Sequence, residues 1–279
     1  YDPYLFYRMK PGDCLFSNRE FAVMNQFNSG GLRDDEKSLE NPEVVVLGDS
    51  FTMGWGVDQD KTYPALLENI VGMKVLNAGI SSFGTARECR LFYKLNLGPN
   101  PTLIFQYHSN DYEENLSSHQ NNFNLPIRTR EQYKTLKEDI DNRRDYYPFK
   151  YTAGVTKAFA RSFVEKQQDL PGDSLQAKLF LDVIRNSGIS NNILVYKIGS
   201  LEETTNTFVN AIDHLLKTPE YATLTNIRTV RIADLLDKSD YFILDEHINA
   251  QGHRKIASRL KEFIPKHLPE DVFVSTAGE

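Results

Sequence analysis

The chain has 279 residues, with 32 Lys and Arg against 38 Asp and Glu, and therefore a formal net charge of −6. A mildly acidic chain without a basic run is a poor candidate for binding nucleic acid through its phosphates. It has no apolar stretch near the roughly 18 residues that a membrane helix needs. Its two cysteines, Cys14 and Cys89, are too few for a disulfide framework or a four-thiolate zinc site. A soluble enzyme or binding protein is therefore expected.

The chain begins at Tyr1 and not at methionine. A removed signal peptide or membrane anchor would make the protein extracytoplasmic, but a cytoplasmic location stays open. The oligomeric state and the pairing of the two cysteines also stay open.

Residues 1–40 are rich in turn formers and aromatic residues and show no sustained period, so we expect an extension that wraps the main body. From residue 43 onward, short apolar runs alternate with segments of helical period. Strands are expected at 43–47, 74–76, 101–107, 192–198 and 227–232, and helices at 62–71, 85–95, 201–216 and 250–263. This alternation predicts one α/β domain, a three-layer α/β/α sandwich with a parallel sheet of about five strands.

The stretch of about 112–174 breaks the alternation and is polar and of mixed charge sign. An insertion of this length is typical of a lid or a binding elaboration, although a plain solvated excursion explains it nearly as well. We expect substrate specificity to reside there.

The tripeptide Gly48-Asp49-Ser50 directly follows the first predicted strand. Because ligands of open parallel sheets bind at the carboxyl ends of the strands, Ser50 is expected to face a cleft. A simple turn would also explain the three residues, and a second copy at 172–174, with no strand before it, is interpreted as a loop and helix N-cap.

Asp245 and His247 provide the pair that a hydroxyl nucleophile needs, a general base and a carboxylate to orient it. The acidic residues of a helix start would give the same pattern. His253 falls within the following helical period and is expected to pack structurally, and a zinc site at the two histidines lacks further ligands.

Two further polar clusters follow predicted strands. Asn110, in the segment that begins at His108, is placed to donate a hydrogen bond to an oxyanion. Gly79 lets the backbone approach a ligand closely. Each cluster alone is equally typical of a turn.

In the order Ser, Gly, Asn and Asp-x-His, the four clusters resemble the SGNH (GDSL-type) hydrolase superfamily. The matching stretches, 43–111 and 192–263, cover about half the chain. The segment 28–33 resembles one found upstream of the Gly-Asp-Ser block in a bacterial subset of that superfamily.

The chain departs from the family pattern twice. His108 stands where the third block usually begins with Gly, and Leu244 occupies the usual position of the Asp, three residues before the His. Asp245 instead lies two residues before His247, a spacing similar to that of the alginate O-acetyltransferase-like branch.

The resemblance implies that Ser50 attacks an acyl carbonyl, that His247 takes its proton and that Asp245 stabilises the imidazolium. It also implies an oxyanion hole formed by the backbone N–H groups of Ser50 and Gly79 and by the Asn110 side chain. Asp49 is expected to hold the loop.

Four further side chains are candidates for lining the substrate site, with core packing or surface salt bridges as equally good explanations: Arg33, Trp55, Arg87 and His108.

The function expected from these residues is hydrolysis of an ester, most simply an O-acetyl or short acyl ester of a carbohydrate. An O-acetyltransferase with the same triad and a non-catalytic glycan-binding relative are the alternatives. The triad mechanism requires no metal or organic cofactor. The α/β-hydrolase fold is excluded because its Gly-x-Ser-x-Gly elbow would need Gly at the position of Thr52.

Overall fold

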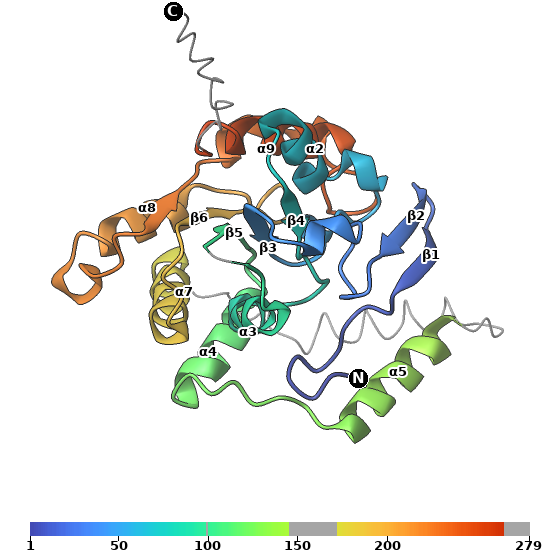
Figure 1. Cartoon of the computed structure of the whole chain (residues 1–279), viewed down its shortest axis with the longest axis horizontal. Coiled ribbons are helices and arrows are strands. Elements are labelled where there is room, and N and C mark those ends of the chain that lie inside the picture. Colours follow the sequence, from blue (N-terminus) through green and yellow to red (C-terminus); the bar gives the residue numbers. More distant parts are fainter. Residues whose placement is uncertain (99, 145–171, 265–279) are drawn as a thin grey trace, which may run out of the picture.

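The computed structural model describes residues 1–98, 100–144 and 172–264, and its centre is a five-stranded parallel sheet. The spatial order is β4-β3-β5-β6-β7, and every neighbouring pair is parallel (Figure 1). The strands are β3 (Val44–Leu47), β4 (Val75–Asn77), β5 (Thr102–Tyr107), β6 (Ile193–Lys197) and β7 (Ile227–Thr229). All five predicted strands are confirmed. Because the order reverses at β3, the carboxyl end of this strand lies at the crevice where open α/β sheets bind ligands.

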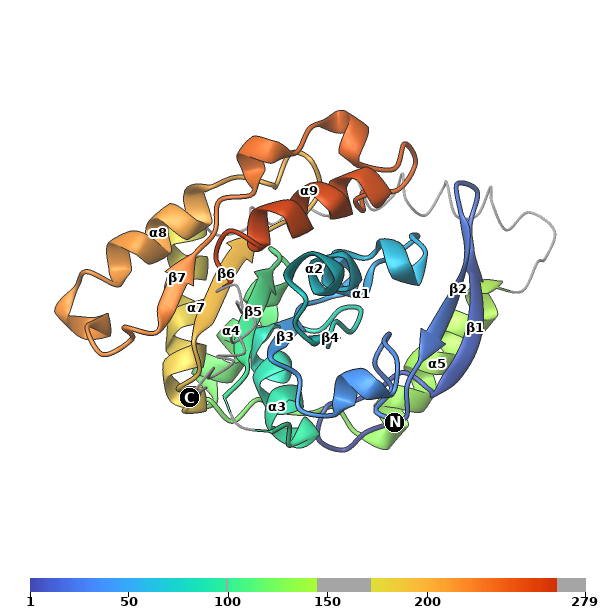
Figure 2. The same ribbon diagram turned by 45° about the horizontal axis from the view of Figure 1, so that its top comes forward.

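Helices cover both faces of the sheet, which confirms the predicted three layers (Figures 1 and 2). Helices α2 (Tyr63–Val71) and α9 (Ala250–Leu260) pack on one face. The other face is covered by α3 (Thr85–Leu95), α4 (Asp111–Gln120), α7 (Asp173–Ser187) and α8 (Thr207–Leu215).

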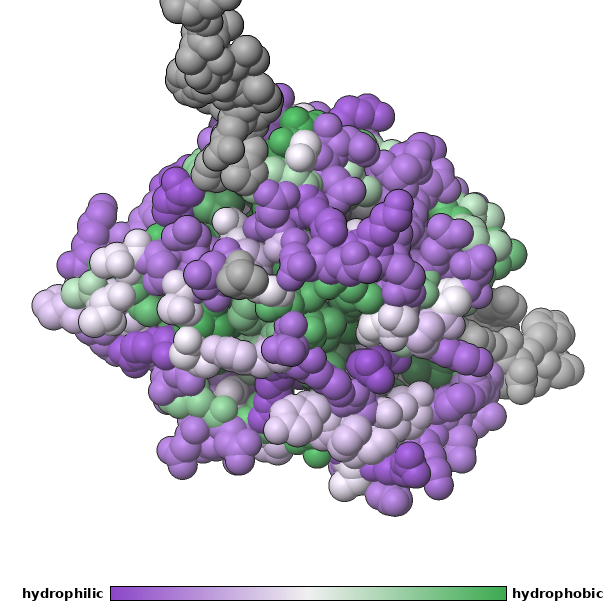
Figure 3. All heavy atoms as spheres, in the orientation of Figure 1, coloured by the Kyte–Doolittle hydropathy of each residue, from purple (hydrophilic) through white to green (hydrophobic). Residues whose placement is uncertain are grey.

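The alternation of β3 explains why its whole sequence is apolar. Val44 and Val46 belong to the core under α2 and α9, whereas Val45 and Leu47 belong to the opposite core. A strand buried on both faces needs apolar residues at every position. Figure 3 shows polar residues over most of the surface, with apolar residues gathered near the middle of the face drawn in Figure 1.

Two predicted helices are shorter than expected. The helix predicted at 201–216 begins only at Thr207, and the one predicted at 250–263 ends at Leu260. In the first, the Thr204 hydroxyl bonds to the carbonyl oxygens of Gly199 and Ser200, and this local bonding competes with the helix.

The extension 1–40 contains an antiparallel hairpin that the sequence pattern did not predict, β1 (Gly12–Ser17) and β2 (Ala22–Phe27). Figure 2 shows this hairpin standing beside the central sheet. Leu5 and Leu32 anchor the extension, because both are fully buried in the main core. The shorter helices are α1 (Ser50–Met53) and the 3-10 turns Lys37–Leu39, Gln59–Lys61, Pro219–Tyr221, Ala233–Leu235 and Lys238–Asp240.

Only part of the predicted insertion lies within the described residues. Its first part forms α4 and α5 (Arg130–Arg144), and residues 145–171 are outside the described ranges. The second Gly-Asp-Ser copy starts α7, with Gly172 as the N-cap residue, as predicted for a helix start.

Cys14 is exposed and Cys89 is buried, and both are free thiols. Within 1–98, 100–144 and 172–264, no helix is long and apolar enough to cross a membrane.

Candidate active site

The Gly-Asp-Ser loop is held by the neighbouring strand. Ser50 is the first residue of α1, and the Asp49 carboxylate caps this helix by accepting the Phe51 N–H at 2.9 Å. Gln106, on β5, accepts both the Asp49 N–H at 3.2 Å and the Thr52 hydroxyl at 3.0 Å. These contacts agree with the structural role predicted for Asp49 and fix the position of the Ser50 backbone.

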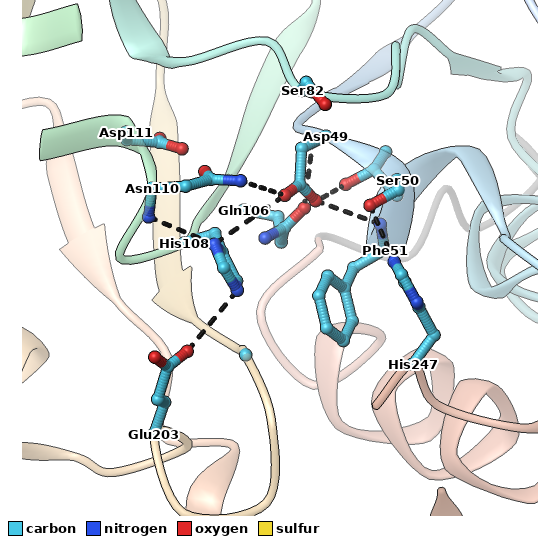
Figure 4. Close-up of polar contacts among 12 residues, drawn as sticks. Asp49, Ser50, Phe51, Ser82, Gln106, His108, Asn110, Asp111, Glu203 and His247 are labelled. Carbon is cyan, nitrogen blue, oxygen red and sulfur yellow. Dashed lines mark hydrogen bonds and ion pairs between the residues drawn. The ribbon is translucent and has the colours of Figure 1, made fainter. Parts of the chain in front are cut away.

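The structure brings Ser50, His247 and Asp245 into one chain of hydrogen bonds (Figure 4 draws the first two). Ser50 Oγ lies 2.8 Å from His247 Nε2, and His247 Nδ1 lies 2.5 Å from Asp245 Oδ1. Asp245 Oδ1 also accepts the backbone N–H of His247 at 3.0 Å. The imidazole is therefore oriented with its Nδ1 toward the carboxylate and its Nε2 toward the hydroxyl, which is the arrangement of a nucleophile, a base and its orienting acid.

Two aromatic rings fix the imidazole of His247. The ring centroid of Phe51 lies 4.6 Å from that of His247, and Trp55 stacks on His247 at 5.1 Å with 19° between the planes. Trp55 Nε1 donates to Asp245 Oδ2 at 3.1 Å. Burial raises the pKa of the Asp245 carboxyl, but the hydrogen bonds from His247 and Trp55 outweigh burial and leave this pKa below its ordinary value. Asp245 is thus kept as a carboxylate.

Asn110 and His108 lie on the other side of Phe51 (Figure 4). Asn110 Nδ2 is 3.5 Å from Asp49 Oδ2, and the Asn110 N–H donates to His108 Nδ1 at 3.1 Å. His108 Nε2 lies 3.5 Å from a carboxylate oxygen of Glu203. His108 therefore accepts a hydrogen bond from the backbone of the candidate oxyanion-hole residue, which the sequence motif alone did not indicate.

The predicted backbone donor Gly79 is engaged elsewhere. Its N–H donates to Asn77 Oδ1 at 3.1 Å, and a Cβ at this position would lie 2.4 Å from the Met53 nitrogen. Ser82, on the same loop, is exposed and has a left-handed φ of 60°. Figure 4 shows Ser82 beside Asp49. Among the described residues no hydrogen bond engages the Ser82 N–H, so this group is a candidate donor that the sequence pattern did not indicate.

Arg33 does not face a substrate. It is 1% exposed, and its guanidinium donates to the carbonyl oxygens of Met53, Gly54 and Val57. Burial lowers the pKa of Arg33 to about 10. The predicted substrate contact is at odds with this burial, because the side chain instead holds the loop that carries Trp55.

Arg87 is likewise committed to a structural contact. Its Nε donates to Glu114 at 2.5 Å, its Nη2 donates to the Ser82 carbonyl oxygen at 2.5 Å, and its guanidinium stacks 4.5 Å over Phe83. Arg87 therefore holds the Ser82 loop through its backbone carbonyl oxygen. Of the four candidate lining residues, Trp55 stacks on His247, and His108 lies against Phe51 and 3.9 Å from the Asp49 carboxylate.

His253 packs inside the molecule, as expected. It is fully buried, and its Nδ1 accepts the Tyr63 N–H at 3.0 Å, which ties α9 to α2. Burial lowers its pKa to about 3, so the ring is neutral near pH 7. The described ranges contain no group of three or more His, Cys, Asp and Glu side chains that could hold a metal ion.

Comparisons with family models and with curated protein sequences find no match. Among solved structures, the chain is similar to a family two carbohydrate esterase from Clostridium thermocellum in complex with cellohexaose, with 12% identity, a TM-score of 0.48, and coverage of 81% of this chain and 64% of that one.

A carbohydrate esterase family 2 enzyme with a carbohydrate-binding domain from Corynascus thermopiles gives 15% identity, a TM-score of 0.47, and coverage of 79% and 64%. A member of the lipolytic protein G-D-S-L family from Veillonella parvula gives 12% identity and a TM-score of 0.46, with coverage of 78% of this chain and 96% of that one. With TM-scores below 0.5, these likenesses decide neither family nor reaction, so the function has to come from the chemistry of the site.

Proposed function

We propose that the protein is a serine ester hydrolase of the SGNH type. The observation that carries the proposal is the unbroken line from Ser50 Oγ to His247 Nε2 (2.8 Å) and from His247 Nδ1 to Asp245 Oδ1 (2.5 Å). The first distance is within the range of ordinary hydrogen bonds, and the second is shorter than that range. Three residues from the two ends of the chain meet in the order that acyl transfer needs.

In this mechanism Ser50 Oγ attacks the acyl carbon and passes its proton to His247 Nε2. The imidazolium is stabilised by Asp245 and then protonates the departing alcohol, leaving an acyl ester on Ser50. Water then attacks this ester while His247 Nε2 takes its proton; the bond from the acyl carbon to Ser50 Oγ breaks, the carboxylic acid leaves, and His247 returns the proton to Ser50 Oγ.

The developing oxyanion needs donors that are already in place. The Ser50 N–H and Asn110 Nδ2 are two of them. As the third donor we propose the backbone N–H of Ser82 and not that of Gly79, since the Gly79 N–H already donates to Asn77 Oδ1.

The substrate class we propose is an O-acetyl or short acyl ester of a carbohydrate. Polar side chains lie on the Asp49 side of the candidate site: Asn110 beside Asp49, His108 next to it and Glu203 beyond His108 (Figure 4). Such groups suit an alcohol rich in hydroxyls better than a long acyl chain, which would need an apolar channel.

O-acetyl transfer is the second candidate, favoured by one observation. The carboxylate two residues before His247 bonds the imidazole directly, and this spacing is the one that resembles the alginate O-acetyltransferase-like branch. A sugar hydroxyl would then replace water in the second step.

The test is hydrolysis of p-nitrophenyl acetate by the protein and by Ser50→Ala, with mass spectrometry after reaction with a serine-directed phosphonate. Ser174→Ala is the matched control, because Ser174 ends the other Gly-Asp-Ser tripeptide and is exposed. Turnover and a single adduct on Ser50 are expected, both lost only in Ser50→Ala.

An adduct on Ser50 without turnover in water would favour the transferase, and turnover on adding a carbohydrate acceptor would establish it. If neither turnover nor an adduct is observed, the result contradicts the proposal and favours a non-catalytic glycan-binding protein.

A further inference from the structure

The turn of hairpin β1–β2 reaches the loop that carries Asp245, more than 200 residues later in the chain. The two oxygens of the Glu20 carboxylate accept the backbone N–H groups of Ile243 and Leu244, each at 2.7 Å. These are the two residues immediately before Asp245. One side chain of the extension thus fixes the backbone from which the acid of the candidate triad projects.

Aromatic contacts join the same two regions. Phe16, on β1, packs edge-on against Trp55 with 4.5 Å between the centroids, and Trp55 donates to Asp245. The ring centroid of Phe21 lies 5.1 Å from that of Phe242, at the start of the loop that carries Asp245. The hairpin therefore supports Asp245 both through its backbone and through its hydrogen-bond partner.

The turn itself is well fixed. Asn18 Oδ1 accepts the N–H groups of Glu20 at 2.7 Å and Phe21 at 3.1 Å, and the Asn18 N–H donates to the Phe21 carbonyl oxygen at 2.9 Å. An Asx turn of this kind restricts the backbone of the residues that follow. Glu20 is accordingly presented by a rigid support.

The loop that carries Asp245 has two backbone contacts of its own, from the Phe242 N–H to the His247 carbonyl oxygen and from the His247 N–H to Asp245 Oδ1, each at 3.0 Å. Between them, the side chains of Ile243 and Leu244 are 91% and 71% exposed, so their burial contributes little to the position of the loop. A half-exposed loop without such anchors samples several conformations unless other contacts restrict it. The contacts from the hairpin supply that restriction.

We propose that hairpin β1–β2 is a positioning element of the active site, in which Glu20 and Phe16 hold Asp245 and Trp55 in register with His247. The proposal rests on the hydrolase function only for its kinetic consequence. Loosening Asp245 removes part of the stabilisation of the His247 imidazolium, which lowers kcat and moves the acid limb of the activity profile to lower pH.

The kinetic test compares Glu20→Ala and Glu20→Gln with Glu36→Ala. Glu36 is the matched control because it also accepts a backbone N–H within the extension, that of Ser29 at 2.6 Å, but away from the acid's loop. We expect kcat for p-nitrophenyl acetate to fall about tenfold in Glu20→Ala with KM nearly unchanged. Glu20→Gln, which keeps one acceptor oxygen, should fall less, and Glu36→Ala should match the parent.

A second readout does not depend on turnover. Trp55 is the single tryptophan of the chain and touches Phe16, Asp245 and His247. A looser hairpin should shift its emission and increase its quenching by acrylamide in Glu20→Ala but not in Glu36→Ala. If the parent hydrolyses no ester, a changed Trp55 signal still supports the positioning role while the proposed function fails.

Unchanged Trp55 emission and quenching in Glu20→Ala would overturn the inference. So would a fall in kcat that follows a fall in thermal stability and leaves the pH profile in place, because that pattern indicates general destabilisation.

Discussion

The two halves of the candidate site are held in different ways. The nucleophile half (Asp49, Ser50, Thr52 and Gln106) rests on the sheet, and three of its four residues are 1% exposed or less. The base half (residues 242–247) is a loop in which the Asp245 and His247 side chains are 19% and 16% exposed. Besides Ser50 and Phe51, its partners are Trp55 and the N-terminal hairpin. The first half therefore shares its contacts with the fold, whereas we expect that the second can be altered with little effect on the fold.

The largest expected effect is in the base half, where a substitution should lower activity without lowering stability. Asp245→Asn should lower kcat by on the order of 10⁴-fold, because the imidazole loses the carboxylate that sets its tautomer and stabilises its charge. The midpoint of urea unfolding should stay near that of the parent. Glu246→Gln, an exposed neighbour in the same loop, is the control and should change neither quantity. A normal kcat in Asp245→Asn would remove Asp245 from the triad.

The opposite result is expected in the nucleophile half. Gln106→Met leaves the Asp49 N–H without its buried acceptor and leaves the Thr52 hydroxyl with Tyr63 Oη alone, so the free energy of unfolding should fall by about 3 kcal/mol. Activity at saturating substrate should fall as well, since the same bonds hold Ser50. Gln26→Met, at an exposed position of β2, is the matched control for urea unfolding. Unchanged stability in Gln106→Met would refute the view that this half shares its contacts with the fold.

The pKa of His253 predicts how the stability of the fold responds to pH. Its pKa is about 3 in the folded protein and about 6.5 in the unfolded chain, so the unfolded state binds more protons between these values. The contribution of His253 to stability is complete above pH 6.5 and decreases as the pH falls, by about 2 kcal/mol at pH 5.

His253→Asn tests this contribution, because Asn Oδ1 replaces Nδ1 as the acceptor for Tyr63 without titrating. The stability advantage of the parent over the variant should shrink from pH 7 to pH 5 in urea unfolding. Burial raises the pKa of Asp34 to about 6, which has the opposite sign but is common to both proteins. A difference that stays constant with pH would show that His253 is not protonated on unfolding.

The sheet and the residues that meet in the candidate triad were predictable from the sequence because their signals are local. A continuous β-branched run such as Val44–Leu47 occurs in a strand buried on both faces, and Ser50 and His247 stand in short motifs at strand ends or before the last helix. The hairpin gave no such signal, because Leu15 and Met24 are exposed while Phe16 faces the body, so apolar residues occur on both sides of the ribbon.

Other features depend on contacts that no local pattern carries. Arg33 stayed open between a substrate contact and core packing, because a sequence does not tell whether a guanidinium meets a ligand or backbone carbonyl oxygens. Gly79 was considered because glycine allows a close backbone approach. In the structure the left-handed φ of this loop is at Ser82, and serine in a sequence rarely indicates a left-handed residue. Glu20 could not be linked to Asp245 across more than 200 residues without the fold.

The smallest predicted effect concerns His108, which lies on the opposite side of Phe51 from His247. Its Nδ1 accepts the Asn110 N–H, so we expect it to set the position of the Asn110 amide that stabilises the oxyanion. His108→Leu should lower kcat by about tenfold or less, since the donor is displaced but not removed. His108→Asn should restore most of this loss, because Asn Oδ1 takes the place of Nδ1. KM for p-nitrophenyl acetate should be similar in both variants. If Asn and Leu were equally impaired, the acceptor at Nδ1 would have no part in placing Asn110, and stacking on Phe51 would explain the residue instead.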